Sequence, residues 1–269
     1  MPVTLSMKAS SALSVLKLSV EGKTAVLTLD NPPANTWTPE SLIELEGIVH
    51  ELNGKPDVVA LVITSASDKF FSAGADLKRF DNLTPDQARP FAEAFGRAFE
   101  ALTHFNGLTI AAINGYAMGG GLEVALACDL RVAEAGAVMA LPEAGVGLLP
   151  CAGGTQNLTL LVGEAWAKRM ILCGETIDAE KALAIGLVEE VTEKGKGLDQ
   201  AKSLAAKAGR QSPDALKACK KLIQMGRSGF SADVLPVERE LFLDLFKGKN
   251  QQEGVSAFLE KRKPEWFYD

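Results

Sequence analysis

Two acidic residues stand beside glycine-rich segments, where a carboxyl group could transfer protons. Glu123 follows three consecutive glycines and a leucine at the start of an apolar helical stretch, and Glu143 follows Leu-Pro after an apolar, strand-like segment. Burying an acid in such surroundings is costly unless it is hydrogen-bonded, protonated or used. Both also have structural explanations, a favourable charge at a helix N-terminus for Glu123 and an exposed turn for Glu143. Two carboxyls facing one site could act as a general acid and a general base.

Two glycine-containing segments each follow a predicted buried strand and could form the same kind of turn. One spans residues 70–78 and the other residues 114–123. Glycine lets backbone N–H groups approach a ligand closely, and ligands of α/β sheets commonly bind beyond the carboxyl ends of the strands. The two turns could therefore direct two N–H donors at one developing oxyanion, although each could also be a tight turn without a ligand.

Other chemistries find less support in the sequence. Residues 145–150 begin like a dinucleotide fingerprint, but proline stands where a small glycine is needed, and no P-loop motif occurs. The two histidines, His50 and His104, lie in polar, helix-like segments away from glycine-rich turns, which disfavours a Ser–His–Asp or Cys–His enzyme. The four cysteines form neither a disulfide framework nor a zinc motif, so we expect a reducing compartment, the cytoplasm.

The elements that hold these residues alternate between strand and helix in the first part of the chain. Residues 15–20 and 24–29 alternate with the period of a hairpin, and apolar runs at residues 58–63 and 109–113 predict strands covered on both faces. An aromatic stripe of Phe91, Phe95 and Phe99 predicts a core-facing helix. Beyond about residue 165 the strand signal nearly disappears, and amphipathic helices are predicted over residues 165–173, 179–185, 198–208, 213–225, 235–246 and 251–261. We therefore predict an α/β part, residues 1–197, and a helical C-terminal region, residues 198–269.

Length and composition indicate a soluble globular protein. The chain has 269 residues, a formal net charge of −6 and 47% hydrophobic residues. The acidic balance disfavours nucleic acid and anionic membranes as partners. The absence of a long apolar run excludes a membrane-spanning helix, and we interpret residues 1–20 as a lead-in to a strand.

Several segments together resemble the enoyl-CoA hydratase/isomerase (crotonase) family, and enoyl-CoA hydratases most of all. They are SAGADLK at residues 72–78, NGYAMGGGLE at residues 114–123 and PEAGVGLLPCAGGTQ at residues 142–156, and the likeness extends through residues 178–188 to 257–263. The resemblance implies an α/β fold, a crotonase-like spiral of ββα repeats, with a helical C-terminal trimerisation region. It also implies a homotrimer or homohexamer as the functional assembly.

The same resemblance assigns roles to individual residues. The N–H groups of Ala75 and Gly120 are implied to bind the thioester oxygen as an oxyanion hole. Glu123 is implied to activate water, and Glu143 to transfer the proton at C2. The implied CoA and substrate contacts are Ala73, Asp76, Leu77 and Lys78, with Lys69, Phe258 and Lys261 as weaker candidates, the last two across a subunit boundary. No metal and no separate cofactor is implied, because CoA is part of the substrate.

The resulting prediction is reversible syn addition of water to a trans-2-enoyl-CoA, giving a 3-hydroxyacyl-CoA. Enoyl-CoA isomerisation and acyl-CoA decarboxylation on the same scaffold are alternatives, and an acyl-CoA-binding or RNA-binding scaffold is a non-enzymatic one. Cys151 stands where many hydratases carry glycine, and Asn157 where arginine is common. Cys151 leaves the preferred acyl length open, and the sequence does not name the acyl group.

Overall fold

The computed structural model describes residues 14–80, 82–228 and 234–268, and most of the predicted lead-in, residues 1–13, lies outside them. Two sheets form the centre of the molecule, a six-stranded one in the order β1-β2-β3-β5-β7-β10 and a four-stranded one in the order β4-β6-β8-β9. The strands are β1 (Leu16–Glu21), β2 (Thr24–Leu29), β3 (Ala60–Ser65), β4 (Phe70–Ser72), β5 (Leu108–Ile113), β6 (Tyr116–Met118), β7 (Leu130–Glu134), β8 (Val138–Ala140), β9 (Ile177–Asp178) and β10 (Glu190–Thr192).

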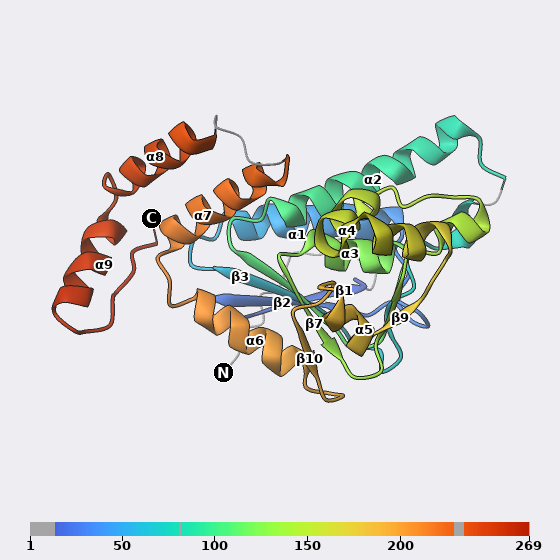
Figure 1. Cartoon of the computed structure of the whole chain (residues 1–269), viewed down its shortest axis with the longest axis horizontal. Coiled ribbons are helices and arrows are strands. Elements are labelled where there is room, and N and C mark those ends of the chain that lie inside the picture. Colours follow the sequence, from blue (N-terminus) through green and yellow to red (C-terminus); the bar gives the residue numbers. More distant parts are fainter. Residues whose placement is uncertain (1–13, 81, 229–233, 269) are drawn as a thin grey trace.

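The chain winds as a spiral in which three successive turns, β3-β4-α2, β5-β6-α3 and β7-β8-α4, each give one strand to the large sheet, one to the small sheet and then a helix (Figure 1). Strands β3, β5 and β7 pair in parallel in the large sheet, and β4, β6 and β8 pair in parallel in the small one. The helices are α1 (Pro39–Asn53), α2 (Pro85–Thr103), α3 (Gly120–Ala127), α4 (Gly154–Leu172), α5 (Ala179–Ala184), α6 (Gly197–Ala208), α7 (Pro213–Met225), α8 (Val234–Leu245) and α9 (Lys249–Leu259). The predicted spiral of ββα repeats is confirmed.

The central strands β3 and β5 of the large sheet are buried on both faces, as their apolar runs predict. On one face Leu61 and Ile63 belong to the main core beneath α1 to α4, and on the other Val62 packs with Ala201 and Ala205 of α6. Figure 1 shows α6 on the side of this sheet opposite to α1. Because helices cover both sides of these two strands, β3 and β5 stay mostly apolar instead of alternating.

Several boundaries differ from the sequence prediction. Strands β9 and β10 lie beyond residue 165, where little strand signal remains, because two or three residues are too few to display a period of two. Helix α4 begins well before the predicted residue 165 and is interrupted at Gly163, whose φ of 76° is not helical. The interruption divides the apolar pattern, so that the sequence indicates only the second half.

The C-terminal helices extend away from the two sheets. The division at residue 197 stays a prediction. Helix α6, which begins there, packs on the large sheet, whereas α7, α8 and α9 reach beyond it (Figure 1). Lys220 of α7 attaches this region by donating hydrogen bonds to Asp129 Oδ2 at 2.7 Å and to the Gly107 carbonyl at 2.9 Å. The chain end is also fixed, since Trp266 Nε1 donates to the Arg210 carbonyl at 3.0 Å.

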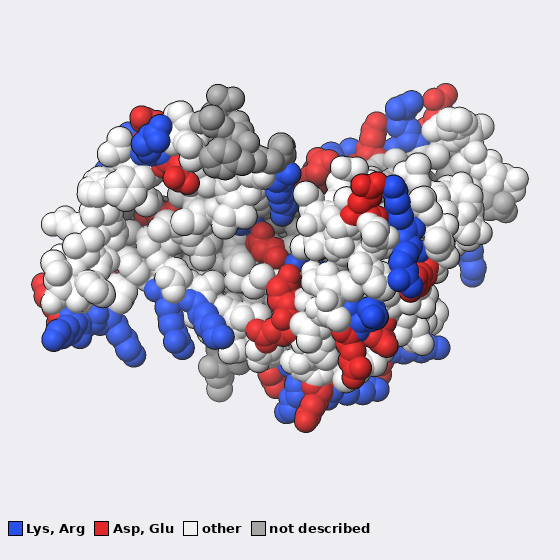
Figure 2. All heavy atoms as spheres, in the orientation of Figure 1, with Lys and Arg blue, Asp and Glu red and all other residues white. Residues whose placement is uncertain are grey.

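The molecular surface carries charges of both signs. Figure 2 shows acidic and basic side chains interspersed over the α/β core. Both histidines lie at exposed helix positions, as predicted. No helix within the described residues is long and apolar enough to cross a membrane.

Candidate active site

The turn after β4 presents a backbone N–H group that has no acceptor among the described residues. Trp37 forms a parallel bridge with Ala75, in which the Trp37 N–H donates to the Gly74 carbonyl at 2.8 Å and the Asp76 N–H donates to the Trp37 carbonyl at 3.2 Å. In such a bridge the bonds involve the residues on either side, so the N–H of Ala75 itself is directed away from Trp37. It donates no hydrogen bond within the described part of the chain.

The start of α3 presents a second such group. Gly120 is the first residue of α3, and the first N–H groups of a helix have no intrahelical acceptor. Its N–H likewise finds no acceptor among residues 14–80, 82–228 and 234–268. The positive end of the helix dipole lies at this point, where it favours a negative charge.

The two turns are in contact, and glycine makes that contact possible. A Cβ on Gly74 would lie 3.1 Å from the nitrogen of Gly120 and 2.7 Å from the Met118 carbonyl oxygen. A Cβ on Gly121 would lie only 2.1 Å from the carbonyl oxygen of Ser72. The two free N–H groups therefore belong to adjoining segments, as an oxyanion hole requires.

Glu123 lies on the first turn of α3, buried and held in place by backbone donors. Its side chain is 2% exposed, and Oε1 accepts hydrogen bonds from the N–H groups of Ala152 at 2.8 Å and Gly154 at 3.0 Å. Burial raises the pKa of Glu123, while the N–H groups of Ala152, Gly154 and Cys151 oppose that rise. A Cβ on Gly154 would lie 2.8 Å from Oε1, so glycine is needed for this approach.

Glu143 is the second carboxyl, and its environment is different. It begins the 3₁₀ helix η2 (Glu143–Val146), and its Oε1 would lie 3.1 Å from a Cβ on Gly119, the residue before the Gly120 donor. Both carboxyl oxygens are buried, and neither has a hydrogen-bond partner within the described residues. Burial, together with the charge of Glu123, raises the pKa of Glu143 to about 7. Such a group can both donate and accept a proton near neutral pH.

Cys151 lies close enough to both carboxyls to be affected by them. Burial and the charges of Glu123 and Glu143 raise the pKa of the Cys151 thiol to about 11. The side chain is therefore a neutral thiol at physiological pH, which does not favour its use as a nucleophile.

The predicted substrate contacts near β4 lie on both sides of that strand. Ala73 and Asp76 flank the Gly74–Ala75 turn, and the Asp76 carboxylate accepts a hydrogen bond from the Lys78 N–H at 3.3 Å. Leu77, half exposed, and Lys78, exposed, follow on η1 (Leu77–Phe80). Lys69 precedes β4, so it lies at the strand end opposite to Ala73, where its Nζ lies over the Phe70 ring.

Within one chain, Phe258 and Lys261 lie away from the other predicted substrate contacts. Both lie at the end of α9, where Phe258 is 81% exposed. Figure 1 shows α9 at the far end of the molecule from α3 and α4. Their assignment to the substrate stays a prediction that concerns a second copy of the chain.

Two features of the site were not predicted from the sequence. The backbone donors at Ala152 and Gly154, which hold Glu123, come from a segment distant along the chain. The pair Gly153-Gly154 at the start of α4 is the signal that could have indicated a close approach. Phe95 was predicted as a core residue, and it is buried, but its ring also contacts Gly120.

Comparison with known proteins shows which family this chain resembles over its length. The model of the enoyl-CoA hydratase/isomerase family matches residues 20–268. A short-chain-enoyl-CoA hydratase of Clostridium acetobutylicum is 37% identical over 251 residues, 93% of this chain and 96% of the relative. The solved structure of Pseudomonas aeruginosa DspI has a TM-score of 0.94 at 55% identity, covering 97% of this chain and all (100%) of that one. An enoyl-CoA hydratase from Bacillus anthracis gives a TM-score of 0.90 at 32% identity, covering 95% of this chain and 100% of that one.

The fold and the matched length define the class of protein. The chain belongs to the enoyl-CoA hydratase/isomerase family, and it has the crotonase fold. The predicted family and fold class are thereby confirmed. The two carboxyls and the two N–H groups lie together where the spiral brings the turn after β4 against the start of α3.

Proposed function

We propose that the chain is an enoyl-CoA hydratase, which adds water reversibly and in syn fashion to a trans-2-enoyl-CoA to give a 3-hydroxyacyl-CoA. The observation that carries the proposal is the pairing of two unlike carboxyls at one turn. Glu123 is fixed by two backbone N–H groups, while Glu143, beside Gly119, has both oxygens buried without a partner in the described structure. The relatives named as hydratases support the same reaction.

In the proposed mechanism the N–H groups of Ala75 and Gly120 bind the thioester carbonyl oxygen. Addition of water to C3 gives that oxygen enolate character, so donors placed in advance stabilise the transition state more than the substrate. Removing one such donor typically lowers kcat by about 10²–10³.

In the proposed mechanism the two carboxyls transfer the protons that the addition of water requires. Glu123, held as a carboxylate, accepts a proton from water as the water oxygen bonds to C3, and Glu143 donates a proton to C2. The pair begins and ends the reaction with one proton, so the two groups titrate together rather than independently. Both backbone donors bind Oε1 of Glu123, so its other carboxyl oxygen can accept the proton from water while the side chain stays in place. Glu143 exchanges its proton without losing any hydrogen bond to the described residues.

The remaining assignments complete the proposal. Ala73, Asp76, Leu77, Lys78 and Lys69 contact the CoA moiety, and Phe258 and Lys261 reach it from another copy in a homotrimer or homohexamer. The reaction needs neither a metal nor a redox cofactor, because the N–H groups polarise the carbonyl and hydration is not a net oxidation or reduction. The enzyme acts in the cytoplasm on acyl-CoA thioesters.

The test is hydration of crotonyl-CoA, followed as the loss of enoyl-thioester absorbance, with medium-chain and aryl enoyl-CoAs in parallel. We expect turnover with at least one of them and a ranking of acyl groups by kcat/KM. A parallel assay with a 3-enoyl-CoA distinguishes the isomerase. No hydration of any substrate, with rapid isomerisation instead, would overturn the hydratase in favour of that alternative.

A further inference from the structure

Beneath the two N–H donors lies a chain of packed aromatic rings. On the Gly120 side, Phe95 of α2 is 3% exposed, and its Cε1 would lie 2.9 Å from a Cβ on Gly120. The ring therefore covers the backbone of Gly120 on one side, while Gly74 lies on another, its Cα 3.7 Å from the same Cβ position. The Gly120 peptide is held between an aromatic ring and the opposite turn.

On the other side, Trp37 controls the position of Ala75. Its backbone bonds to Gly74 and Asp76, which immediately flank Ala75, so a movement of Trp37 carries the Ala75 N–H with it. The indole ring is 3% exposed and packs edge-on against Phe99, with ring centroids 5.7 Å apart at 71°. The donor of the first turn is thereby connected to α2.

Phe99 closes the connection between the two sides. It is 1% exposed and lies one helical turn from Phe95, at 5.7 Å and 84° between the rings. Edge-to-face ring pairs have a preferred geometry, and close-packed interiors transmit displacements because they contain little free space. The path from Gly120 through Phe95, Phe99 and Trp37 to Ala75 is therefore continuous.

We propose that Trp37, Phe95 and Phe99 form an aromatic brace that sets the separation of the Ala75 and Gly120 N–H groups. They are positioning residues for the thioester oxygen, because they act through the two backbone donors. The proposal rests on the proposed function for its substrate, although the binding of a thioester carbonyl by these donors can be measured without turnover.

The experiment compares Phe99→Leu with the matched control Phe105→Leu. Both residues are 1% exposed and belong to the same core cluster, but in the described structure only Phe99 packs in the chain of rings between the donors. The probe is para-dimethylaminocinnamoyl-CoA, whose absorption moves to longer wavelength when its carbonyl accepts hydrogen bonds. Crotonyl-CoA kinetics and Tm are measured on the same preparations.

We expect Phe99→Leu to lower kcat about tenfold with KM changed less than about twofold, and to reduce the wavelength shift of the bound probe. Phe105→Leu should lose a comparable amount of Tm while keeping kcat within about twofold and the full wavelength shift. Trp37→Phe is a second variant, since its Nε1 has no hydrogen-bond partner in the described structure, so the exchange breaks none. It should reduce the wavelength shift in the same way.

Two results would overturn the brace. One is an equal effect of Phe99→Leu and Phe105→Leu on kcat and probe spectrum, which would make the rings ordinary core. The other is a full wavelength shift in Phe99→Leu and Trp37→Phe. A wild-type protein that shifts the probe spectrum but hydrates no enoyl-CoA would contradict the proposed function and leave the brace measurable. A wild-type protein that does not shift the spectrum would overturn both.

Discussion

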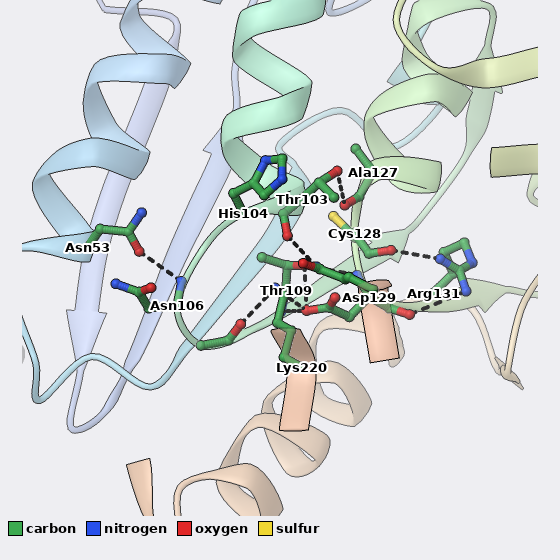
Figure 3. Close-up of polar contacts among 12 residues, drawn as sticks. Asn53, Thr103, His104, Asn106, Thr109, Ala127, Cys128, Asp129, Arg131 and Lys220 are labelled. Carbon is green, nitrogen blue, oxygen red and sulfur yellow. Dashed lines mark hydrogen bonds and ion pairs between the residues drawn. The ribbon is translucent and has the colours of Figure 1, made fainter. Parts of the chain in front are cut away.

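Two partly buried acidic residues of this protein, Asp129 and Glu143, differ in how many hydrogen bonds their carboxyl oxygens receive. Asp129, which follows α3, has Oδ2 surrounded by donors, the Thr109 N–H at 2.8 Å, Thr109 Oγ1 at 3.0 Å and Lys220 Nζ at 2.7 Å (Figure 3). Glu143 has none for either oxygen among the described residues. A carboxylate oxygen that receives three hydrogen bonds, as Asp129 Oδ2 does, helps to stabilise the fold, whereas buried carboxylate oxygens without partners cost stability and are available to a substrate.

Arg131, a neighbour of Asp129, is also hydrogen-bonded to other parts of the chain. Arg131, 2% exposed, donates to the Cys128 carbonyl at 2.9 Å and the Leu187 carbonyl at 2.8 Å, and pairs with Glu189. Figure 3 shows the part of this network in which Thr109 of β5, Asp129, Arg131 of β7 and Lys220 of α7 lie together. It joins the C-terminal helices to the large sheet. The comparison suggests a criterion for the active site: buried ionisable groups whose hydrogen-bonding capacity the chain leaves unused.

The largest predicted effect concerns the fixed base. Glu123→Gln keeps an oxygen that can accept from Ala152 and Gly154 but removes the charge that takes a proton from water. We expect kcat for crotonyl-CoA hydration to fall about 10³-fold, with Tm and CoA binding nearly unchanged. Steady-state kinetics beside calorimetry measure this, and a rate within tenfold of wild type would remove Glu123 from the mechanism.

The second effect concerns the N–H groups of Ala75 and Gly120, which also lack a hydrogen-bond acceptor among the described residues. In Gly120→Ala the new Cβ would lie 2.9 Å from Phe95, so either the ring or the peptide must shift. We expect kcat to fall about 10²-fold. Gly47→Ala in α1 is the control, because its Cβ meets nothing within 4 Å, and it should leave kcat unchanged. Equal kinetics for the two variants would contradict the assignment of Gly120.

The third effect concerns Asp129 and is tested by removing one of its hydrogen-bond donors. Lys220→Met leaves the partly buried Asp129 without its cation, at a cost of about 1–3 kcal/mol in unfolding free energy. Adding Asp129→Asn should recover part of that loss. Urea unfolding measures the stability, and kcat at temperatures where the variant is folded should stay within about twofold of wild type. A large loss of kcat in the folded variant would make this network part of the site.

The smallest effect is the pH dependence contributed by Glu143. In the folded chain the pKa of Glu143 is raised from 4.5 to about 7. Between these two pH values the folded chain therefore binds more protons at Glu143 than the unfolded chain does. The free energy of unfolding consequently falls as the pH rises through this range. Glu143→Gln removes this pH-dependent loss of stability, because the glutamine amide does not ionise. Its unfolding free energy should match wild type near about pH 4.5 and exceed it by roughly 1–3 kcal/mol at about pH 8. Urea titrations at both pH values test this, and a difference independent of pH would contradict the raised pKa.

Sequence reasoning captures much of the fold and identifies the two acids, but not the distinction between them. The apolar runs at β3 and β5 are long enough to indicate strands buried on both faces, whereas β9 is not. An acid in an apolar segment is recognisable as unusual in either case. Which acid is held and which is free depends on the start of α4, a contact between distant segments that no local pattern encodes.

The positions of the aromatic rings and of α9 show the same limitation. Spacing along α2 predicts that Phe95 and Phe99 face the core, yet their connection to Trp37 depends on how the spiral closes. The exposed Phe258 cannot be assigned to the site from one chain, because the contact proposed for it involves a second copy.

The most direct test of the central claim follows the proton that Glu143 is proposed to deliver. Crotonyl-CoA is hydrated in D₂O by wild type, Glu143→Gln and Lys220→Met, and the product is analysed by mass spectrometry and NMR. We expect one solvent-derived deuterium at C2 with wild type and Lys220→Met, and product formation at least about 10²-fold slower with Glu143→Gln. Deuterated product formed by Glu143→Gln at the wild-type rate would contradict the central claim.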